Sequence, residues 1–285
     1  MDFADDDACL KYIFNARFGG MKCPNCDRRT FYQVKGRKAF ACACGYQINP
    51  TANTIFHKSD TKLKDWFFAI YLFSNAKNGV SSKELQRHLG CTYKTAWRIA
   101  SKIRGLMKQN SDKLSGVIEA DETYIGGRRN QAGKFANKGI VMGAVQRGGQ
   151  IRTKHIPDTE SNTLLKMLRS NIKFGSRVIT DDTSSYKPNK VNRIGMTHDK
   201  ICHSKREYVK GDIYTNTIEG FFSQLKRSIN GTYHSVSLKH LQSYVDEFSY
   251  HYNHRSACFH DLLFRLCGKQ GLAGQRIAIF RGVRV

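Results

Sequence analysis

The chain has 285 residues, 40% of them hydrophobic and 11% aromatic, which is enough for a sizeable core and for more than one domain. Lys and Arg number 47 against 23 Asp and Glu, so the formal net charge of +24 favours a nucleic-acid partner over an acidic protein partner. The sequence has no apolar run that could span a bilayer, and its start, "MDFADDDACL", is acidic where a secretory signal is basic. We therefore expect a globular cytoplasmic protein that binds nucleic acid and no membrane.

Four cysteines cluster near the N-terminus, Cys23 and Cys26 in "CPNC" and Cys42 and Cys44 in "CAC". In a cytosolic chain such spacing favours metal over disulfides, and four thiolates on a short hairpin suit the tetrahedral site of structural zinc. The second pair is one residue tighter than Cys-x-x-Cys, so unmetallated cysteines, or His57 as a substitute ligand, remain alternatives. We predict that residues 1–59 form a zinc ribbon with one structural zinc ion.

Residues 60–110 have the pattern of helices. Apolar side chains recur at helical spacing in "LKDWFFAIYLF", and the following segment predicts two helices, capped by Ser81 or Ser82 and by Thr92, around a turn at Gly90. This pattern indicates a DNA-binding helix-turn-helix, with an ordinary packed helical hairpin as the alternative. Five side chains of the second helix are predicted to be exposed and to reach DNA: Tyr93, Lys94, Arg98, Lys102 and Arg104.

The next segment, residues 115–235, mixes strands and helices. Three strands are predicted in "GVIEADETYI" and in "GIVMGAVQRGGQIRTKHI", which turns at its glycines, and another in "SRVITDD". Helices are predicted in "TESNTLLKMLRS" and "NTIEGFFSQLKRSING", and residues 236–285 are predicted to form a helical extension. A basic loop between the first two strands carries Arg128, Arg129, Lys134 and Lys138, and we expect it to order on DNA.

Asp121 comes at the end of the run "VIEAD" and Asp181 at the end of "RVITD", and Glu219 lies at the margin of the apolar face of a helix. Any one of them alone would be read as a surface charge. If the sheet brings both strand ends beneath that helix, the three carboxylates can bind two hard divalent cations. Two such ions about 3.5 to 4 Å apart stabilise the attacking and leaving oxygens of a phosphodiester displacement. Glu122 and Asp182 remain alternatives, because neighbours in a strand point to opposite faces and the pattern alone does not choose between them.

The segments "ADETYIGG", "VITDDTSSY" and "NTIEGFFSQLKR", behind a ribbon ending in "CGYQINPTANTIFHKS" and a helix-turn-helix, resemble bacterial insertion-sequence transposases of the ISXO-like group, relatives of the Merlin elements. The resemblance covers nearly the whole chain. It implies an α+β multidomain protein in which the ribbon and helix-turn-helix precede an RNase H-like mixed α/β DDE catalytic domain and the helical C-terminal extension. It also implies that Asp121, Asp181 and Glu219 are the catalytic residues and hold two Mg²⁺ or Mn²⁺ ions.

The resemblance further implies a DNA transposase that binds the terminal inverted repeats of an insertion sequence, cleaves at the transposon ends and joins the 3′ hydroxyls to target DNA. Its partners would be double-stranded DNA and copies of itself, in a homodimer or higher synaptic oligomer associated with the bacterial nucleoid. A related nuclease or resolvase, and a catalytically dead DNA-binding regulator, are the alternatives. Further predicted DNA contacts are Lys226 and Arg227 on the Glu219 helix, and Asn253 and Arg255 in "YHYNHR", where helix packing is an equal alternative.

Overall fold

The computed structural model describes residues 3–109, 112–126, 138–181, 186, 188–201, 211–255, 262–263 and 265. The chain divides into two compact units, one built from residues 1–75, 82–106 and 257–285, and the other from residues 76–81 and 107–256. We call them the N-terminal and C-terminal units; the finer four-domain division stays a prediction. Within the described ranges, no helix combines the length and the apolar character needed to cross a membrane.

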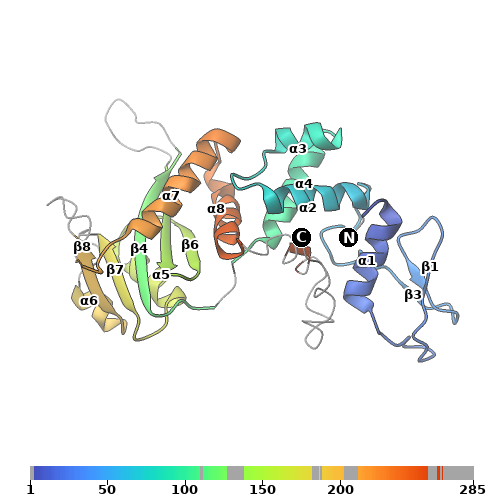
Figure 1. The fold of residues 1–285 in the computed structure, drawn as a ribbon, viewed down its shortest axis with the longest axis horizontal. Coiled ribbons are helices and arrows are strands. Elements are labelled where there is room, and N and C mark those ends of the chain that lie inside the picture. Colours follow the sequence, from blue (N-terminus) through green and yellow to red (C-terminus); the bar gives the residue numbers. More distant parts are fainter. Residues whose placement is uncertain are drawn as a thin grey trace. The chain divides into compact units, whose positions relative to one another are not determined.

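The N-terminal unit combines a small antiparallel sheet with helices (Figure 1). Its first helix was not predicted, because its acidic start and short apolar face give little periodicity; Asp5 caps it by accepting a hydrogen bond from Ala8 N at 2.8 Å. Phe14 of this helix stacks on Phe40 of the sheet, with ring centroids 4.0 Å apart. In chain order the elements are α1 (Asp6–Phe18), β1 (Tyr32–Gln33), β2 (Phe40–Ala41), β3 (Gln47–Ile48), α2 (Leu63–Asn75), α3 (Ser82–Leu89) and α4 (Tyr93–Leu106).

The helices α3 and α4 form the consecutive pair that the sequence indicates. Gly90 between them has φ +61°, a backbone conformation that glycine adopts without steric cost. Thr92 caps α4, because its Oγ1 accepts a hydrogen bond from Thr95 N at 3.3 Å. The buried face of α4 consists of Ala96, Ile99, Ala100, Ile103 and Arg104.

The C-terminal unit is built on a five-stranded sheet of order β6-β5-β4-β7-β8. β4, β5 and β6 are antiparallel and connected along the chain, whereas β7 and β8 run parallel to β4. A parallel connection needs a crossover, and helices α5 and α6 lie in the two connections concerned. The strands are β4 (Val117–Ile125), β5 (Gly139–Gln146), β6 (Ile151–Ile156), β7 (Arg177–Asp181) and β8 (Thr197–Ile201); the helices are α5 (Ser161–Asn171) and α6 (Pro188–Arg193).

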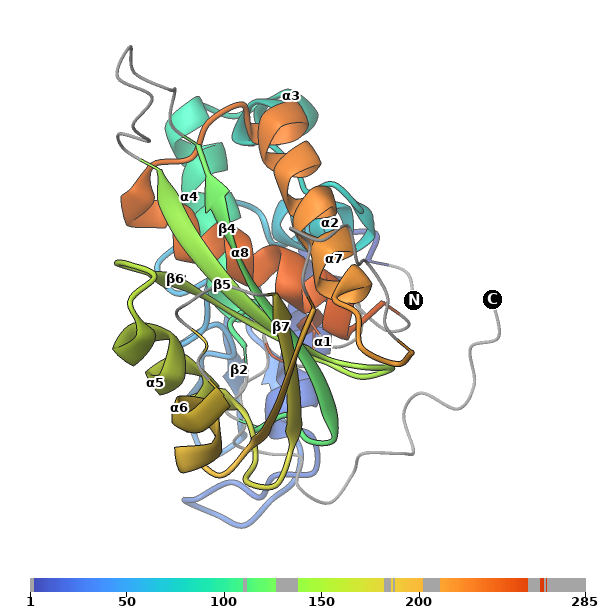
Figure 2. The same cartoon turned by 90° about the vertical axis from the view of Figure 1, so that its left-hand side faces the viewer.

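Helices cover both faces of this sheet (Figure 2). One face carries α5, α6 and a core that includes Ile118, Met142 and Leu168; we call it the α5 face. The other, the α7 face, carries α7 (Asn216–Ser228), a π-helical turn (Ile229–Tyr233) and α8 (Leu238–Asn253). The strand β8 and the helix α6 were not predicted from the sequence. Their segments alternate little, because each is short and only partly buried.

Candidate active site and metal centres

The pairing of β4 with β5 decides which acid of β4 faces α7. Residues directly opposite in an antiparallel pair point to the same side of the sheet, and Asp121 is opposite Gly143 while Glu119 is opposite Val145. Val145 belongs to the core beneath α7 and α8, so Glu119 and Asp121 lie on the α7 face. Glu122 points the other way, where the hydroxyl of buried Tyr186 donates a hydrogen bond to its Oε2 at 2.7 Å.

The same alternation places Asp181 on the α7 face. β7 runs parallel to β4 with Glu119 opposite Ile179, and Val178 belongs to the core of the α5 face. Ile179 and Asp181 therefore point toward α7, on the side that Asp121 occupies. Asp182, the alternative from the sequence, lies outside the described residues.

Gly143 allows α7 to lie close to the sheet beside Asp121. A Cβ at Gly143 would be 2.7 Å from Ile218 Cδ1 and 3.0 Å from Phe222 Cζ, both on α7. Such contacts are too short for most real Cβ atoms, so a larger residue would move the helix or repack its side chains. The role of this glycine was missed in the sequence, where it lies inside an apolar strand without a turn signal.

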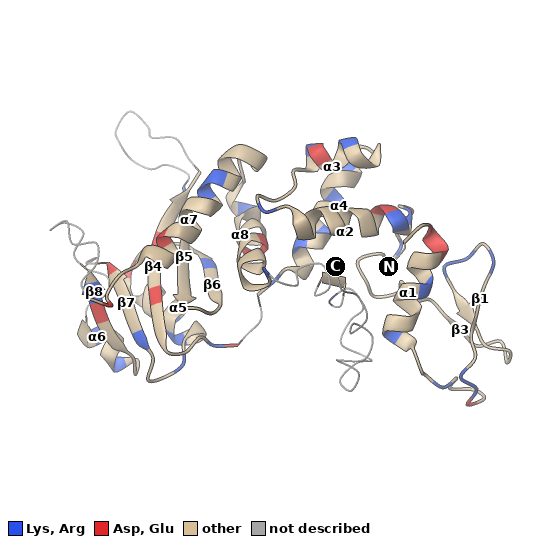
Figure 3. Ribbon diagram, in the orientation of Figure 1, with Lys and Arg blue, Asp and Glu red and all other residues tan. Residues whose placement is uncertain are grey.

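Glu219 lies in the first turn of α7, directly after the fully buried Ile218. Its side chain is exposed, and its Oε1 accepts a hydrogen bond from Thr215 Oγ1 at 2.7 Å. The helix α7 therefore buries its apolar face on the sheet, and the Glu219 carboxylate lies at the margin of that buried face. Figure 3 shows acidic residues on β4 beside the start of α7 and basic residues further along the helix.

The carboxylates affect one another electrostatically. Burial raises the pKa of Asp121 to about 7, and the nearby charges of Glu122, Asp181 and Glu219 add to this effect. A bound cation would relieve both the desolvation and the repulsion, so the oxygen donors fit a hard divalent ion. In the described part of the chain, the only group of three or more metal-ligating side chains with all ligand atoms within 4.8 Å is the cysteine cluster. The three carboxylates are thus neighbours with a wider spacing.

The four cysteines come together as a candidate zinc site. Their sulfur atoms all lie within 4.8 Å of one another, with Cys23 Sγ 3.5 Å from Cys44 Sγ and Cys26 Sγ 3.5 Å from Cys42 Sγ. Tetrahedral zinc with Zn–S bonds of about 2.3 Å requires sulfur separations of this order. His57 is not part of the cluster, and its Nδ1 accepts a hydrogen bond from Asn53 N at 3.1 Å.

A tighter turn allows the shorter Cys-x-Cys pair to join the cluster. After the first pair, Asp27 N donates to Cys23 O at 2.9 Å, and after the second Gly45 N donates to Cys42 O at 2.9 Å. The second turn therefore closes one residue earlier. Asp27 and Gly45 both have positive φ, +57° and +89°, and glycine tolerates the second without strain.

The predicted DNA-contacting face of α4 is smaller in the structure. Tyr93 and Lys94 are exposed, whereas Lys102 Nζ donates to Ile55 O at 2.8 Å and Arg98 is half-buried. The prediction that Arg104 is exposed is wrong, because its side chain is only 2% accessible and its guanidinium lies 5.2 Å from the centroid of the Phe73 ring. Arg104 follows Ala100 by one helical turn and thus lies on the buried face. Trp97 is 38% exposed on this helix and was not among the predicted contacts.

The other predicted DNA contacts fall into three groups. Lys226 and Arg227 are exposed on α7, and Arg255 is exposed with its guanidinium 4.9 Å from the centroid of the Tyr252 ring. Asn253 instead packs against β6, because its Oδ1 accepts from Ile151 N at 2.8 Å and its Nδ2 donates to Ile151 O at 3.1 Å. Arg128 and Arg129 lie outside the described residues.

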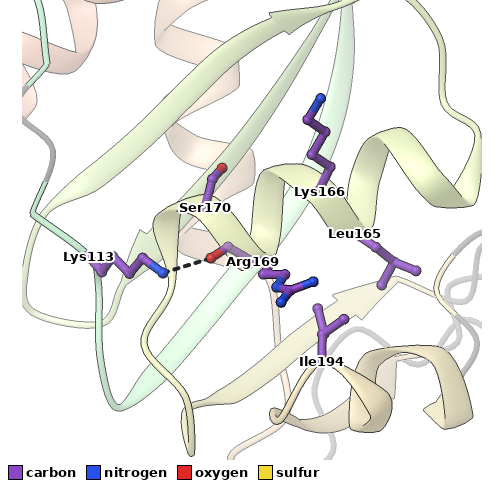
Figure 4. Close-up of a pocket in the computed structure, with 6 residues that line it drawn as sticks. All are labelled: Lys113, Leu165, Lys166, Arg169, Ser170 and Ile194. Carbon is purple, nitrogen blue, oxygen red and sulfur yellow. Dashed lines mark hydrogen bonds between the residues drawn. The ribbon is translucent and has the colours of Figure 1, made fainter.

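A pocket of about 440 Å³ opens on the α5 face, away from the carboxylates (Figure 4). Lys113 Nζ donates to Arg169 O at 2.9 Å at its edge, near the end of α5. The pocket is separate from the acidic site because Leu165 and Ile194 pack on the opposite core. Its lining consists of Lys113, Leu165, Lys166, Arg169, Ser170 and Ile194.

A cysteine ribbon followed by a mixed sheet with acids beside one helix is the arrangement of a DDE transposase of RNase H-like fold. Known families agree: the ISXO2-like transposase domain matches residues 113–253, and the transposase zinc-ribbon domain matches residues 4–47. The chain belongs to the ISXO2-like transposases, and the predicted order of a zinc ribbon before a DDE transposase domain is confirmed.

Relatives and solved structures are similar to the chain over different lengths. A protein of transposable element ISH50 from Halobacterium salinarum is 25% identical over 252 residues, covering 80% of this chain and 84% of that protein. A transposase-like protein of Haemophilus influenzae is 28% identical over 104 residues, covering 36% of this chain and 81% of that protein. The catalytic core domain of BIV integrase has 12% identity and a TM-score of 0.32, with 47% of this chain and 81% of that chain covered. A chain of a simian T-cell lymphotropic virus intasome has 10% identity and a TM-score of 0.31, with 59% and 60% covered.

Proposed function

We propose that this transposase binds the terminal inverted repeats of an insertion sequence, cleaves at its ends and joins the 3′ hydroxyls to target DNA. The observation that carries the proposal is geometric: strand register places Asp121 and Asp181 on the α7 face of the sheet, and Glu219 lies in the first turn of the helix that packs on that face. The acids come from β4, β7 and α7, and they are the residues that the family resemblance selects as catalytic.

In this proposal Asp121, Asp181 and Glu219 hold two Mg²⁺ or Mn²⁺ ions, which stabilise charge on the attacking and leaving oxygens of the phosphodiester. The chain contributes the placement of these ligands. Asp121 is fixed by the β4–β5 ladder, whereas Glu219 is held by the packing of α7 over Gly143. In the metal-free protein the raised pKa keeps a proton on the Asp121 carboxyl up to about pH 7, so metal binding at lower pH must displace it.

Basic side chains supply the DNA contacts in the proposed reaction. The net charge of +24 favours binding to phosphates, and Lys226 and Arg227 lie on the same helix as Glu219. Tyr93 and Lys94 are exposed on α4, where a helix-turn-helix contacts the major groove. Joining both ends of one element requires two active sites, so we also propose a homodimer or higher synaptic oligomer.

The test is Mg²⁺-dependent cleavage and strand transfer on a labelled transposon end, with end binding measured in parallel. Asp121→Asn, Asp181→Asn and Glu219→Gln should each bind DNA and lose cleavage by several orders of magnitude, since each removes an anionic ligand. Glu122→Gln is the matched control, because Glu122 faces Tyr186 on the other side of the sheet and its amide can still accept that hydrogen bond. Full activity in Glu219→Gln would refute the site, and cleavage without joining would identify a nuclease.

A further inference from the structure

A second acid of β4, Glu119, lies two residues before Asp121 on the α7 face, and its side chain has 0% exposure. A buried carboxylate is costly unless it is paired and hydrogen-bonded. Glu119 meets both conditions, because Arg147 Nε donates to its Oε1 at 2.8 Å. The interactions of this acid extend from the sheet to the start of α7.

Glu119 caps the helix that carries Glu219. Its Oε2 accepts hydrogen bonds from Thr217 N at 2.8 Å and from Ile218 N at 3.2 Å, and its Oε1 accepts from Thr217 Oγ1 at 3.0 Å. The residue at the usual capping position, Thr215, makes no side-chain cap hydrogen bond. The first amides of α7 are therefore satisfied by a carboxylate from the neighbouring strand, with a favourable interaction with the helix dipole.

Arg147, in the turn after β5, holds the segment that leads into the helix. Its NH1 donates to Asp212 O at 2.6 Å and its NH2 donates to Tyr214 O at 2.9 Å. The guanidinium also lies 3.6 Å from the centroid of the Tyr214 ring. One planar cation thus joins Glu119 to two backbone carbonyls and an aromatic ring, a geometry that lysine cannot reproduce.

We propose that Glu119 and Arg147 are positioning residues that set where Glu219 stands relative to Asp121. Two amides fixed by one carboxylate determine both the height of the first turn of α7 along β4 and its rotation. Glu219 lies one residue after Ile218, so a shift of this turn moves its carboxylate directly. The inference rests on the proposed two-metal function of Asp121, Asp181 and Glu219. Groups that orient metal ligands typically change metal affinity or activity by about 10- to 100-fold when mutated.

The test compares Glu119→Gln with Glu247→Gln, which makes the same chemical change at another fully buried glutamate. Glu247 lies on α8 and accepts hydrogen bonds from the hydroxyl of Tyr233, in the π-helical turn. In metal-free protein, backbone amide exchange at Thr217 and Ile218 should accelerate at least about tenfold in Glu119→Gln and remain unchanged in Glu247→Gln. The half-saturating Mn²⁺ concentration, measured by calorimetry and by cleavage, should rise about tenfold only in Glu119→Gln, with most of the rate restored at high Mn²⁺.

A wild-type half-saturating Mn²⁺ concentration in folded Glu119→Gln would overturn the inference. So would equal losses of Mn²⁺ affinity in Glu119→Gln and Glu247→Gln that are proportional to their losses of stability. Should Glu119→Gln fail to fold, Arg147→Lys decides in the same way, because it keeps a charge near Glu119 and loses the planar contacts to Asp212 and Tyr214. The two proposals fail separately. An active Glu219→Gln sinks the metal site itself, whereas an inactive Glu219→Gln beside an unaffected Glu119→Gln sinks only the positioning role.

Discussion

Asp121 lies directly opposite Gly143 in the β4–β5 ladder, and Ile218 of α7 occupies the space that a side chain at Gly143 would need. The candidate catalytic acid and a close approach of the helix to the sheet therefore share one register position. The absence of a side chain at Gly143 allows α7 to bring Glu219 to this part of the sheet.

Gly143→Ala should reduce cleavage, because the new Cβ would lie 2.7 Å from Ile218 Cδ1. Overpacking of this kind lowers the free energy of unfolding by about 1 to 3 kcal/mol, and urea unfolding would measure the loss. Adding Ile218→Val removes the Cδ1 atom and should restore much of the activity and stability. Ile218→Val alone serves as the control and should cost only about 0.5 to 1.5 kcal/mol. If the double variant is no better than Gly143→Ala, the contact does not set the position of the helix.

Asp121→Asn should be inactive and yet more stable than the wild type in metal-free buffer above pH 7. The pKa of Asp121 is raised from its ordinary value of 3.8 to about 7 in the folded protein. Between these two pH values the unfolded chain loses the proton more readily than the folded one, so the stability of the folded state falls as the pH rises. That shift lowers the free energy of unfolding of the wild type by at most roughly 4 kcal/mol above pH 7, and asparagine, which does not ionise, avoids this loss. Thermal unfolding at pH 5 and pH 8 measures it, and the difference between variant and wild type should shrink at pH 5. An equal difference at both pH values would contradict the assignment.

Purified protein should contain about one zinc per chain, and Cys44→Ser should lose it as completely as Cys23→Ser. The sulfur of Cys44 lies 3.5 Å from that of Cys23, so the short Cys-x-Cys pair contributes to the same site. Elemental analysis gives the zinc content, and circular dichroism reports the loss of order. Cys91→Ser is the control, since this cysteine is outside the cluster. Zinc retained by Cys44→Ser would show that the second pair contributes only Cys42.

Affinity for DNA should fall steeply with salt, and Lys94→Ala should reduce the slope of the logarithmic plot by about one without changing stability. Arg104→Ala should lower stability and leave the salt slope unchanged. Arg104 is buried over Phe73, so its loss removes packing and no exposed charge. Fluorescence anisotropy at several salt concentrations, with thermal unfolding in parallel, separates the two effects. A flat salt dependence would point away from phosphate contacts.

Much of this protein could be read from local sequence patterns. Helical periodicity predicted α2, α4 and α7, alternation and apolar runs predicted β4 to β7, and spacing identified Cys23, Cys26, Cys42 and Cys44 as one group. These features depend on residues close together in the chain, where a few intervals determine which side chains share a face. Long amphipathic elements were therefore predictable, whereas the short α6 and β8 were not.

Which acid of each pair faces α7 depends on strand pairing between residues far apart in sequence. Asp121 and Glu122 are equivalent in the pattern, and only the opposition of Asp121 to Gly143 and the contact of Glu122 with Tyr186 separate them. The burial of Arg104, the close approach at Gly143 and the capping of α7 by Glu119 likewise exist only after the elements pack. The sequence alone determined the long amphipathic helices and strands, the cysteine group and the candidate acids. Only the tertiary structure decided which face of the sheet each side chain lies on. Partners across a sheet are set by strand register and packing, which involve residues far apart in the sequence and leave no local pattern.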